Sequence, residues 1–220
     1  MEQDSIFEDV PLIVLPPEED VTEPGPPFAP GVFAGEISVM PLLTPDNFLP
    51  NILKLIEGAE GSIYMQTQYI MVRNNTPALQ KLVAAIRDKQ QAGLDIRLIL
   101  RGDGDGAQEQ LEALTSRGIE PERVKFQSRV HNKGILVDGK TVVVGSQNWS
   151  EPGVTNNRDA SLLIRNAAMA KYFEAIFLHD WTRLAKHRVQ NESDMPMIAT
   201  GQADAVEGMR TMYWDDYYST

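Results

Sequence analysis

Residues 131–150 read HNKGILVDGKTVVVGSQNWS, and this stretch decides the fold. Two mostly apolar runs rich in β-branched residues, 130–137 and 141–144, flank the dipeptide Asp138-Gly139, which is typical of a tight hairpin turn. The pattern predicts two antiparallel strands that lie side by side. The polar residues stand at the ends of both strands opposite the turn, so the hairpin should bring them together.

The polar residues at those strand ends combine into a chemically useful set. Side chains alternate along a strand, so His131 and Lys133 should project from one face. The returning strand should place Ser146 and Asn148 beside them, and Gly145 permits close approach of the backbone. An imidazole, a fixed cation and two neutral polar groups suit attack on the phosphorus of a phosphate diester.

Strands and helices are expected to alternate on both sides of this hairpin. Further strands are expected at residues 36–40, 62–72, 95–100, 124–127 and 160–164. Helices are expected at residues 44–57, 77–91, 108–116 and 167–181. In the first helix, Thr44 is the expected N-cap and Pro45 the first helical residue. This order predicts the α/β class, with a mixed sheet flanked by helices in a sandwich.

The two ends of the chain differ from its middle in composition. Residues 1–30 hold eight acidic residues, no Lys or Arg and seven of the 14 prolines, which predicts an acidic linker or a docked arm. Residues 190–220 hold six acidic residues and one basic residue and are interpreted as an acidic tail. Residues 31–189, with 17 acidic and 19 basic residues, should form the catalytic domain. They lack the basic excess of a dedicated DNA-coating protein.

Composition also excludes several kinds of site. The chain has no cysteine, which rules out disulfides, thiolate zinc sites and cysteine nucleophiles. It has three histidines, and no stretch of it approaches the roughly 20 apolar residues of a transmembrane segment. The acidic N-terminus lacks the basic region of a secretory signal. The compartment is unknown on these grounds, with the cytoplasm favoured.

The fixed positions of residues 131–148 follow the pattern H-x-K-x4-D-x6-G-S-x-N, and the stretch resembles the HKD motif of the phospholipase D superfamily. The resemblance extends over roughly residues 36–185. SIYMQTQYI and DIRLILRGDGDG look like the family's first two core strands, and NNRDASLLI with AKYFEAIFLHDW looks like its closing strand and helix. These segments are most similar to the second-half domain of bacterial two-motif members. The resemblance implies a phospholipase D-like sandwich and phosphodiester chemistry.

The resemblance also implies a role for each polar residue of the motif. His131 would be the nucleophile that forms a phosphohistidine, or its acid–base partner. Lys133 would bind the phosphate oxygens, and Asn148 and Ser146 would complete the phosphate pocket. Asp159 lies where the family has an acidic residue, more often Glu, that orients an active-site histidine. A carboxylate on Nδ1 would fix the tautomer and leave Nε2 free to attack.

Other polar residues near the motif have structural interpretations. Asp138, at the hairpin turn, is expected to be structural. Trp149 is expected to pack in the core, although it could line a substrate cleft. Gln66 and Gln68 share one face of the expected strand and could point toward the site or play only a structural part.

The resemblance implies neither a metal nor another cofactor. Lys133 and the neutral donors would supply the electrostatic role that a metal otherwise plays. Asp103 and Asp105 in RGDGDG superficially resemble a calcium loop. The loop lacks the glutamate that closes such a site, so we expect a polar strand-to-helix turn there.

The family mechanism uses two histidines, whereas this chain has one H-x-K. His179 and His187 have no lysine two residues on and no Gly-Ser after it, and we expect them at the surface. The chain would therefore supply half of a site. Its partner would be a second HKD-bearing domain, provided by homodimerisation or by the other half of a longer chain.

Three functions are compatible with these features. The preferred hypothesis is phosphodiester hydrolysis or transphosphatidylation on a phospholipid or a similar diester, with water or an alcohol as the acceptor. A metal-independent nuclease of the same superfamily is the alternative, although the nearly balanced charge argues against a polyanion held by many Lys and Arg contacts. The third hypothesis is an inactive half-site that acts as a binding or assembly module.

Overall fold

The computed structural model describes residues 28–103 and 106–187. All the helices and strands below belong to the compact unit that begins at Gly31. The linker expected at 1–30 falls outside the described residues except for 28–30, and the tail expected at 190–220 falls outside them entirely. The division of the chain into linker, domain and tail therefore stays a prediction.

A seven-stranded mixed sheet with the order β1-β7-β6-β5-β2-β3-β4 forms the centre of the fold. The strands are β1 (Ser38–Leu43), β2 (Ser62–Thr67), β3 (Asp95–Arg101), β4 (Val124–Gln127), β5 (Gly134–Val137), β6 (Thr141–Gly145) and β7 (Ala160–Arg165). β2, β3 and β4 are parallel, and the remaining neighbours pair antiparallel. The predicted mixed sheet is confirmed, and the predicted hairpin β5–β6 lies in its middle.

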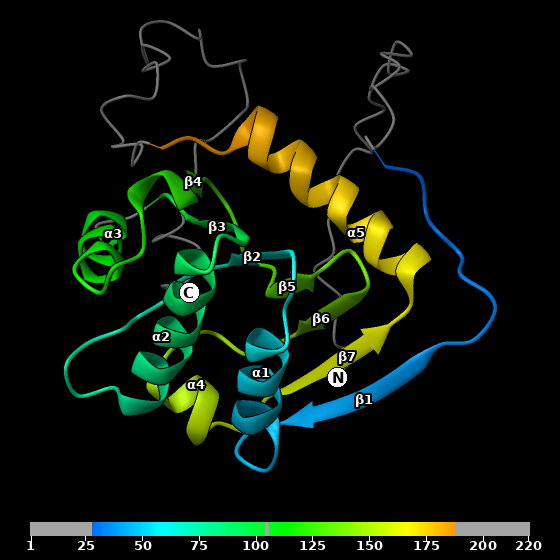
Figure 1. The fold of residues 1–220 in the computed structure, drawn as a ribbon, viewed down its shortest axis with the longest axis horizontal. Coiled ribbons are helices and arrows are strands. Elements are labelled where there is room, and N and C mark those ends of the chain that lie inside the picture. Colours follow the sequence, from blue (N-terminus) through cyan, green and yellow to red (C-terminus); the bar gives the residue numbers. More distant parts are fainter. Residues whose placement is uncertain (1–27, 104–105, 188–220) are drawn as a thin grey trace, which may run out of the picture. The chain divides into compact units, whose positions relative to one another are not determined.

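Helices cover both faces of this sheet (Figure 1). They are α1 (Phe48–Glu57), α2 (Pro77–Gln91), α3 (Ala107–Thr115), α4 (Glu151–Thr155) and α5 (Ala167–His179), with a 3-10 turn at Pro121–Arg123 and a π-helical turn at Asp180–Leu184. The first four helices pack on one face and α5 packs on the other, against β2, β5 and β6. No helix in the described ranges is both long enough and apolar enough to cross a membrane.

Two hydrophobic cores hold the helices to the sheet. The apolar stripe predicted for α2 is buried, with Leu79, Leu82 and Ile86 at most 1% exposed. It packs with α1 against one face. On the other face Tyr64 of β2 stacks on Phe177 of α5, with ring centroids 5.1 Å apart. Burial of these apolar side chains supplies the main favourable free energy of folding.

Two expected strands are shorter than the sequence predicted. β2 ends at Thr67 rather than at residue 72, because the chain then turns toward the segment after β6, where the N–H of Met71 donates to the carbonyl of Trp149 at 2.8 Å. β5 begins at Gly134 rather than at residue 130, because its pairing with β2 does not extend to residues before Gly134. His131 and Lys133 therefore precede the strand instead of lying within it.

The expected start of the first helix is also wrong. Thr44 is buried, and its hydroxyl donates to the carbonyl of Gly153 at 3.2 Å instead of capping α1. Asn47 is the residue before the helix, and its Oδ1 accepts the N–H of Leu43 at 2.7 Å. A turn over residues 44–47 thus separates β1 from a helix that begins at Phe48.

Candidate functional site

The predicted site residues lie at the edge of the sheet that is formed by the ends of its strands, next to the central strands. β5 begins and β6 ends at this edge, and both are central strands. The segment before β5 carries His131 and Lys133, and the segment after β6 carries Ser146 and Asn148. Asp159 immediately precedes β7, the next strand over. The fold therefore places all five residues at neighbouring strand ends.

His131 and Lys133 contact each other although they do not lie in a strand. Nζ of Lys133 lies 3.4 Å from Nδ1 of His131 and donates to the His131 carbonyl at 2.6 Å. Burial lowers the pKa of the Lys133 ammonium, and the nearby carboxylate of Asp159 counteracts part of that effect. The imidazole is exposed, so an ammonium and an accessible imidazole stand together at the edge.

Ser146 and Asp159 form a second pair at the same edge. The Ser146 hydroxyl donates to Oδ1 of Asp159 at 2.7 Å, and it accepts the N–H of Ala160 at 3.1 Å. Among the described residues, the Asp159 side chain has no hydrogen bond to His131. The expectation that Asp159 orients a histidine therefore stays a prediction, since its observed partner is Ser146.

Gly145 is required by the close packing of β6 against β7. A Cβ atom at this position would overlap both the side chain and the Cα atom of Ser161 on the neighbouring strand. The predicted close approach of the backbone is thus a strand-to-strand contact. It draws the ends of β6 and β7 together, and with them Ser146 and Asp159.

Asn148 carries a buried polar atom without a partner. Its Oδ1 is inaccessible and makes no hydrogen bond within the described part of the chain. Buried polar groups are nearly always paired, and among the described side chains this atom is an exception together with Oγ1 of Thr67. The adjacent Trp149 is 2% exposed and accepts from Met71 through its carbonyl, which confirms its packing role.

A network of amides below the motif was missed by the sequence interpretation. Oε1 of Gln66, on β2, accepts from Nδ2 of Asn132 at 2.8 Å. Nε2 of Gln66 donates to Oδ2 of Asp180 at 2.9 Å and to Oε1 of Gln127 at 3.2 Å. Gln66 is 6% exposed, so the bond to Asn132 anchors the residue between His131 and Lys133 from beneath. Gln66 was a candidate, but Asn132 and Asp180 were not.

Asp138, the fixed acid of the motif, lies at the opposite end of β5. Its carboxylate accepts the backbone N–H groups of Glu60, Gly61 and Ser62, at 2.8–3.3 Å. Burial alone would raise the pKa of this carboxyl, but those N–H groups outweigh burial and lower the pKa. The structural role predicted for Asp138 is confirmed, because it ties the hairpin turn to the loop after α1.

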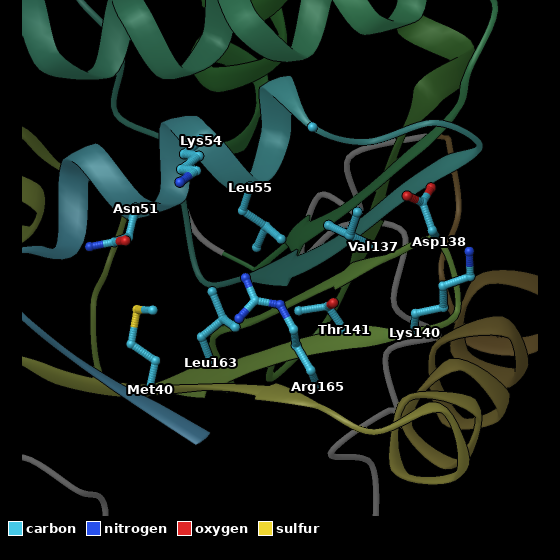
Figure 2. A pocket seen from close by; sticks show the side chains of 11 residues that line it. Met40, Asn51, Lys54, Leu55, Val137, Asp138, Lys140, Thr141, Leu163 and Arg165 are labelled. Atoms are coloured by element: carbon cyan, nitrogen blue, oxygen red, sulfur yellow. The ribbon is translucent and has the colours of Figure 1, made fainter. Parts of the chain in front are cut away.

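A cavity of about 270 Å³ beside Asp138 is separate from the candidate site. Figure 2 shows its lining, in which side chains of α1, among them Lys54, face Arg165 of β7 and the hairpin residues Asp138 and Lys140. No fixed residue of the motif other than Asp138 lines it. This cavity therefore lies at the end of the hairpin opposite His131 and Lys133.

The remaining candidates are engaged elsewhere. His179 contacts Asp180 at 3.5 Å, and Nδ1 of His187 lies 3.2 Å from the Val124 carbonyl, so both are placed by their own surroundings. Asp103 pairs with Arg101 at 2.6 Å and accepts the N–H of Arg129 at 2.8 Å. Asp105 lies outside the described residues. Elsewhere in the described ranges, no three His, Asp or Glu side chains are grouped as metal ligands.

Comparisons with known proteins identify a family model and relatives that match this chain. A family model described as "Cardiolipin synthase, PLD-like domain" matches residues 52–181. The chain is 25% identical over 142 residues to the mitochondrial cardiolipin hydrolase of Xenopus tropicalis, covering 64% of each chain. It is also 25% identical over 137 residues to the Mus musculus protein of that name, covering 62% of this chain and 59% of the other. The chain thus spans less than two thirds of the length of these relatives.

Solved structures show a similar fold. Nuc from Salmonella typhimurium, a phospholipase D family member, aligns with a TM-score of 0.56 at 21% identity, over 69% of this chain and 97% of the other. NucT from Helicobacter pylori gives 0.56 at 15% identity, over 68% and 98%. Phosphatidylserine synthase from Haemophilus influenzae gives 0.51 at 15% identity, over 68% and 40%. At these identities the likeness shows the fold alone.

Proposed function

Because the chain belongs to the phospholipase D superfamily, we propose that it cleaves phosphodiester bonds through a covalent phosphohistidine at His131. The observation that carries the proposal is the contact of an exposed imidazole with an ammonium group, 3.4 Å apart, at the end of a central strand. The ammonium group of Lys133 would neutralise phosphate charge while the imidazole attacks phosphorus. The side-chain amide nitrogen of Asn148 would donate to a phosphate oxygen, since a phosphate diester offers only acceptors.

In the proposed first step, Nε2 of His131 attacks phosphorus, so that a P–N bond forms and the P–O bond to the leaving alcohol breaks. A second histidine gives its proton to the leaving oxygen. In the second step this histidine removes a proton from water or an alcohol, whose oxygen attacks phosphorus and breaks the P–N bond. Attack through Nε2 requires a proton on Nδ1, so the Lys133 ammonium, which lies 3.4 Å from Nδ1 here, would have to move to the phosphate. Asp159 is the proposed acceptor of the Nδ1 proton in the completed site.

The second histidine is proposed to come from a second HKD-bearing domain. His179 and His187 are held by contacts with Asp180 and Val124, and neither has a lysine beside it in the manner of His131. A homodimer with its two-fold axis near the motif would bring two copies of His131 to one shared site. The other half of a longer chain would do the same.

A phospholipid or a similar small diester is the proposed substrate. The two curated relatives are named as hydrolases of cardiolipin, which is a phospholipid. The nearly balanced charge of residues 31–189 also favours a small diester over a polyanion. Nuclease activity is the alternative, and an inactive binding module is the third outcome that the test must recognise.

A mixing titration tests the shared site. Wild-type chains are mixed with His131→Ala chains under free exchange, and turnover of bis(p-nitrophenyl) phosphate is measured. If each site needs both copies of His131, activity falls as the square of the wild-type fraction. Mixing with His187→Ala chains is the matched control, because that histidine contacts β4 and should leave activity unchanged.

Sedimentation and a second substrate complete the experiment. An inert monomer would support a detached half-site or a binding module and would contradict the homodimer. Turnover of a single-stranded oligonucleotide with none of a short-chain phospholipid would favour the nuclease. A fully active monomer, with a linear mixing curve, would overturn the two-histidine mechanism.

A further inference from the structure

A cavity of about 210 Å³ lies between α5 and the sheet, on the face opposite α1 and α2. Apolar side chains line most of it, from β2, β5, β6 and α5. The chief ones are Tyr64, Leu136, Val142, Val144, Phe173 and Ile176. Asn132 and Lys133 of the motif line it as well, so this groove adjoins the candidate site.

The groove offers apolar surface and one charge. The hydroxyl of Tyr64 donates to Asp95 at 2.8 Å, and Gln66 is fully engaged by Asn132 and Asp180. Of the described residues that line the groove, Lys133 is the charged one. A ligand that matches this lining has a long apolar part and a single anionic group at one end.

The boundary between groove and motif carries little side-chain bulk. Gly134 pairs with Val144 across the hairpin, and both line the groove. Gly134 contributes no side chain, so the wall of the groove is backbone at this position. An alkyl chain attached to an anionic group at Lys133 would therefore meet backbone where it passes Gly134.

The geometry points to the α5 groove as the binding site for one alkyl or acyl chain of a phosphate-bearing amphiphile, whose phosphate lies at His131 and Lys133. This inference rests on the proposed function only in where it places the phosphate. Val144, Phe173 and Ile176 are all partly exposed, so a chain in the groove would cover apolar surface that the fold leaves open. Each methylene that leaves water should improve binding about fourfold.

Binding of n-alkyl phosphates tests the groove without requiring turnover. Butyl, hexyl and octyl phosphate, each below its micelle concentration, are titrated by calorimetry into the wild-type protein. We expect the affinity to rise with each added methylene until the groove is filled. An affinity that is independent of chain length would overturn the inference.

A matched pair of variants locates the chain. Val144 lines the groove, whereas its register partner Leu162 on β7 is 43% exposed and does not. Val144→Trp should flatten the dependence on chain length, and Leu162→Trp should keep it. Circular dichroism checks both folds, and Ile176→Trp on α5 replaces Val144→Trp if the latter does not fold. Equal chain-length dependence in the groove and control variants would refute the site.

The same variants and alkyl phosphates distinguish two alternative occupants of the groove. If the groove is instead covered by a second copy of the chain, Val144→Trp should disrupt self-association, and octyl phosphate should dissociate the dimer. If a single-stranded oligonucleotide displaces octyl phosphate, the groove is not an alkyl site. Turnover of bis(p-nitrophenyl) phosphate by the wild type reports on the proposed function separately. Binding without turnover supports the groove alone, and turnover without chain-length dependence rejects the groove alone.

Discussion

The two ends of strand β5 carry parts of the same motif and are held in opposite ways. At the turn, Asp138 accepts N–H groups from three successive residues and is fixed from several directions. At the other end, the ring of His131 contacts Lys133 and is otherwise exposed, as far as the chain is described. The same short motif thus contains a residue that holds the fold together and a residue whose ring is exposed, to which we assign the proposed chemistry.

This difference separates stability from activity in a way that mutation can measure. A carboxylate that satisfies several backbone donors contributes to folding, because its loss leaves those donors without partners. An exposed imidazole contributes little to folding and can be replaced at low cost. The same substitution by Asn at either end should therefore change different properties.

The largest expected effect is on activity, at the His131 end of β5. His131→Asn should lower turnover of bis(p-nitrophenyl) phosphate by at least roughly 10²- to 10⁴-fold, the range of acid–base assistance alone. Its free energy of unfolding should stay within about 0.5 kcal/mol of the wild type, as for other exposed positions. Steady-state kinetics and urea titration measure the two effects. Retention of activity within tenfold would remove His131 from the mechanism.

The next effect concerns the anchor beneath the motif. Gln66→Leu breaks the bonds to Asn132 and Asp180, so kcat should fall roughly 10- to 100-fold as the segment shifts. Asp180→Asn keeps an oxygen acceptor for Gln66 and should have a smaller effect. A change confined to KM would argue against a positioning role.

Gln68→Leu is the matched control for that anchor. The side chain of Gln68 has no hydrogen-bond partner among the described residues, although its carbonyl accepts the N–H of Arg101. The kcat of the Gln68→Leu variant should therefore stay at the wild-type value. Equal losses at both glutamines would point to a general loss of packing instead.

At the Asp138 end of β5, we expect the effect to be on the free energy of unfolding. Asp138→Asn should lower the free energy of unfolding by about 1–3 kcal/mol, because a carboxylate with several donors is lost, and should leave kcat unchanged. The pKa of Asp138 is lowered in the fold, so its stabilisation is present above the unfolded pKa near 3.9 and is lost as the pH falls through the folded pKa. The stability gap between wild type and variant should close below about pH 4. A gap that persists at lower pH would contradict this assignment.

The smallest expected effect is that of a chelator. The proposed mechanism uses Lys133 where other enzymes use a metal, so EDTA should leave turnover unchanged. Addition of Mg²⁺, Ca²⁺ or Zn²⁺ after dialysis should likewise have no effect. Activity that disappears with EDTA and returns with one of these ions would show that the electrostatic role of Lys133 is insufficient.

The sequence predicted the parts of the fold that depend on local patterns. The buried stripe of α2 and the hairpin about Asp138-Gly139 follow from periodicity and turn chemistry. The early ends of β2 and β5 do not, because they are set by partners far along the chain. The N–H of Met71 donates to the carbonyl of Trp149, and no pattern within residues 62–72 predicts that contact.

The sequence could predict which residues lie near the candidate site, but not the contacts that hold them. The spacing from His131 to Asn148 predicted that these residues lie near one another, and the strand order places them at neighbouring strand ends. Asn132 was passed over because strand alternation would turn it away from the site, whereas the segment is not a strand. Asp180 was hidden because its contact with Gln66 joins the end of α5 to β2, which no local pattern records.

The pairing of β1 with β7 has a consequence for how the protein is made. During synthesis Ser38–Leu43 leaves the ribosome long before its partner Ala160–Arg165, and such distant pairings close slowly. Ser146 likewise waits for Asp159 at the entrance to β7. A nascent chain that already displays His131 and Lys133 would thus have an open sheet edge, and would lack the pairing of Ser146 with Asp159, until β7 inserts between β1 and β6.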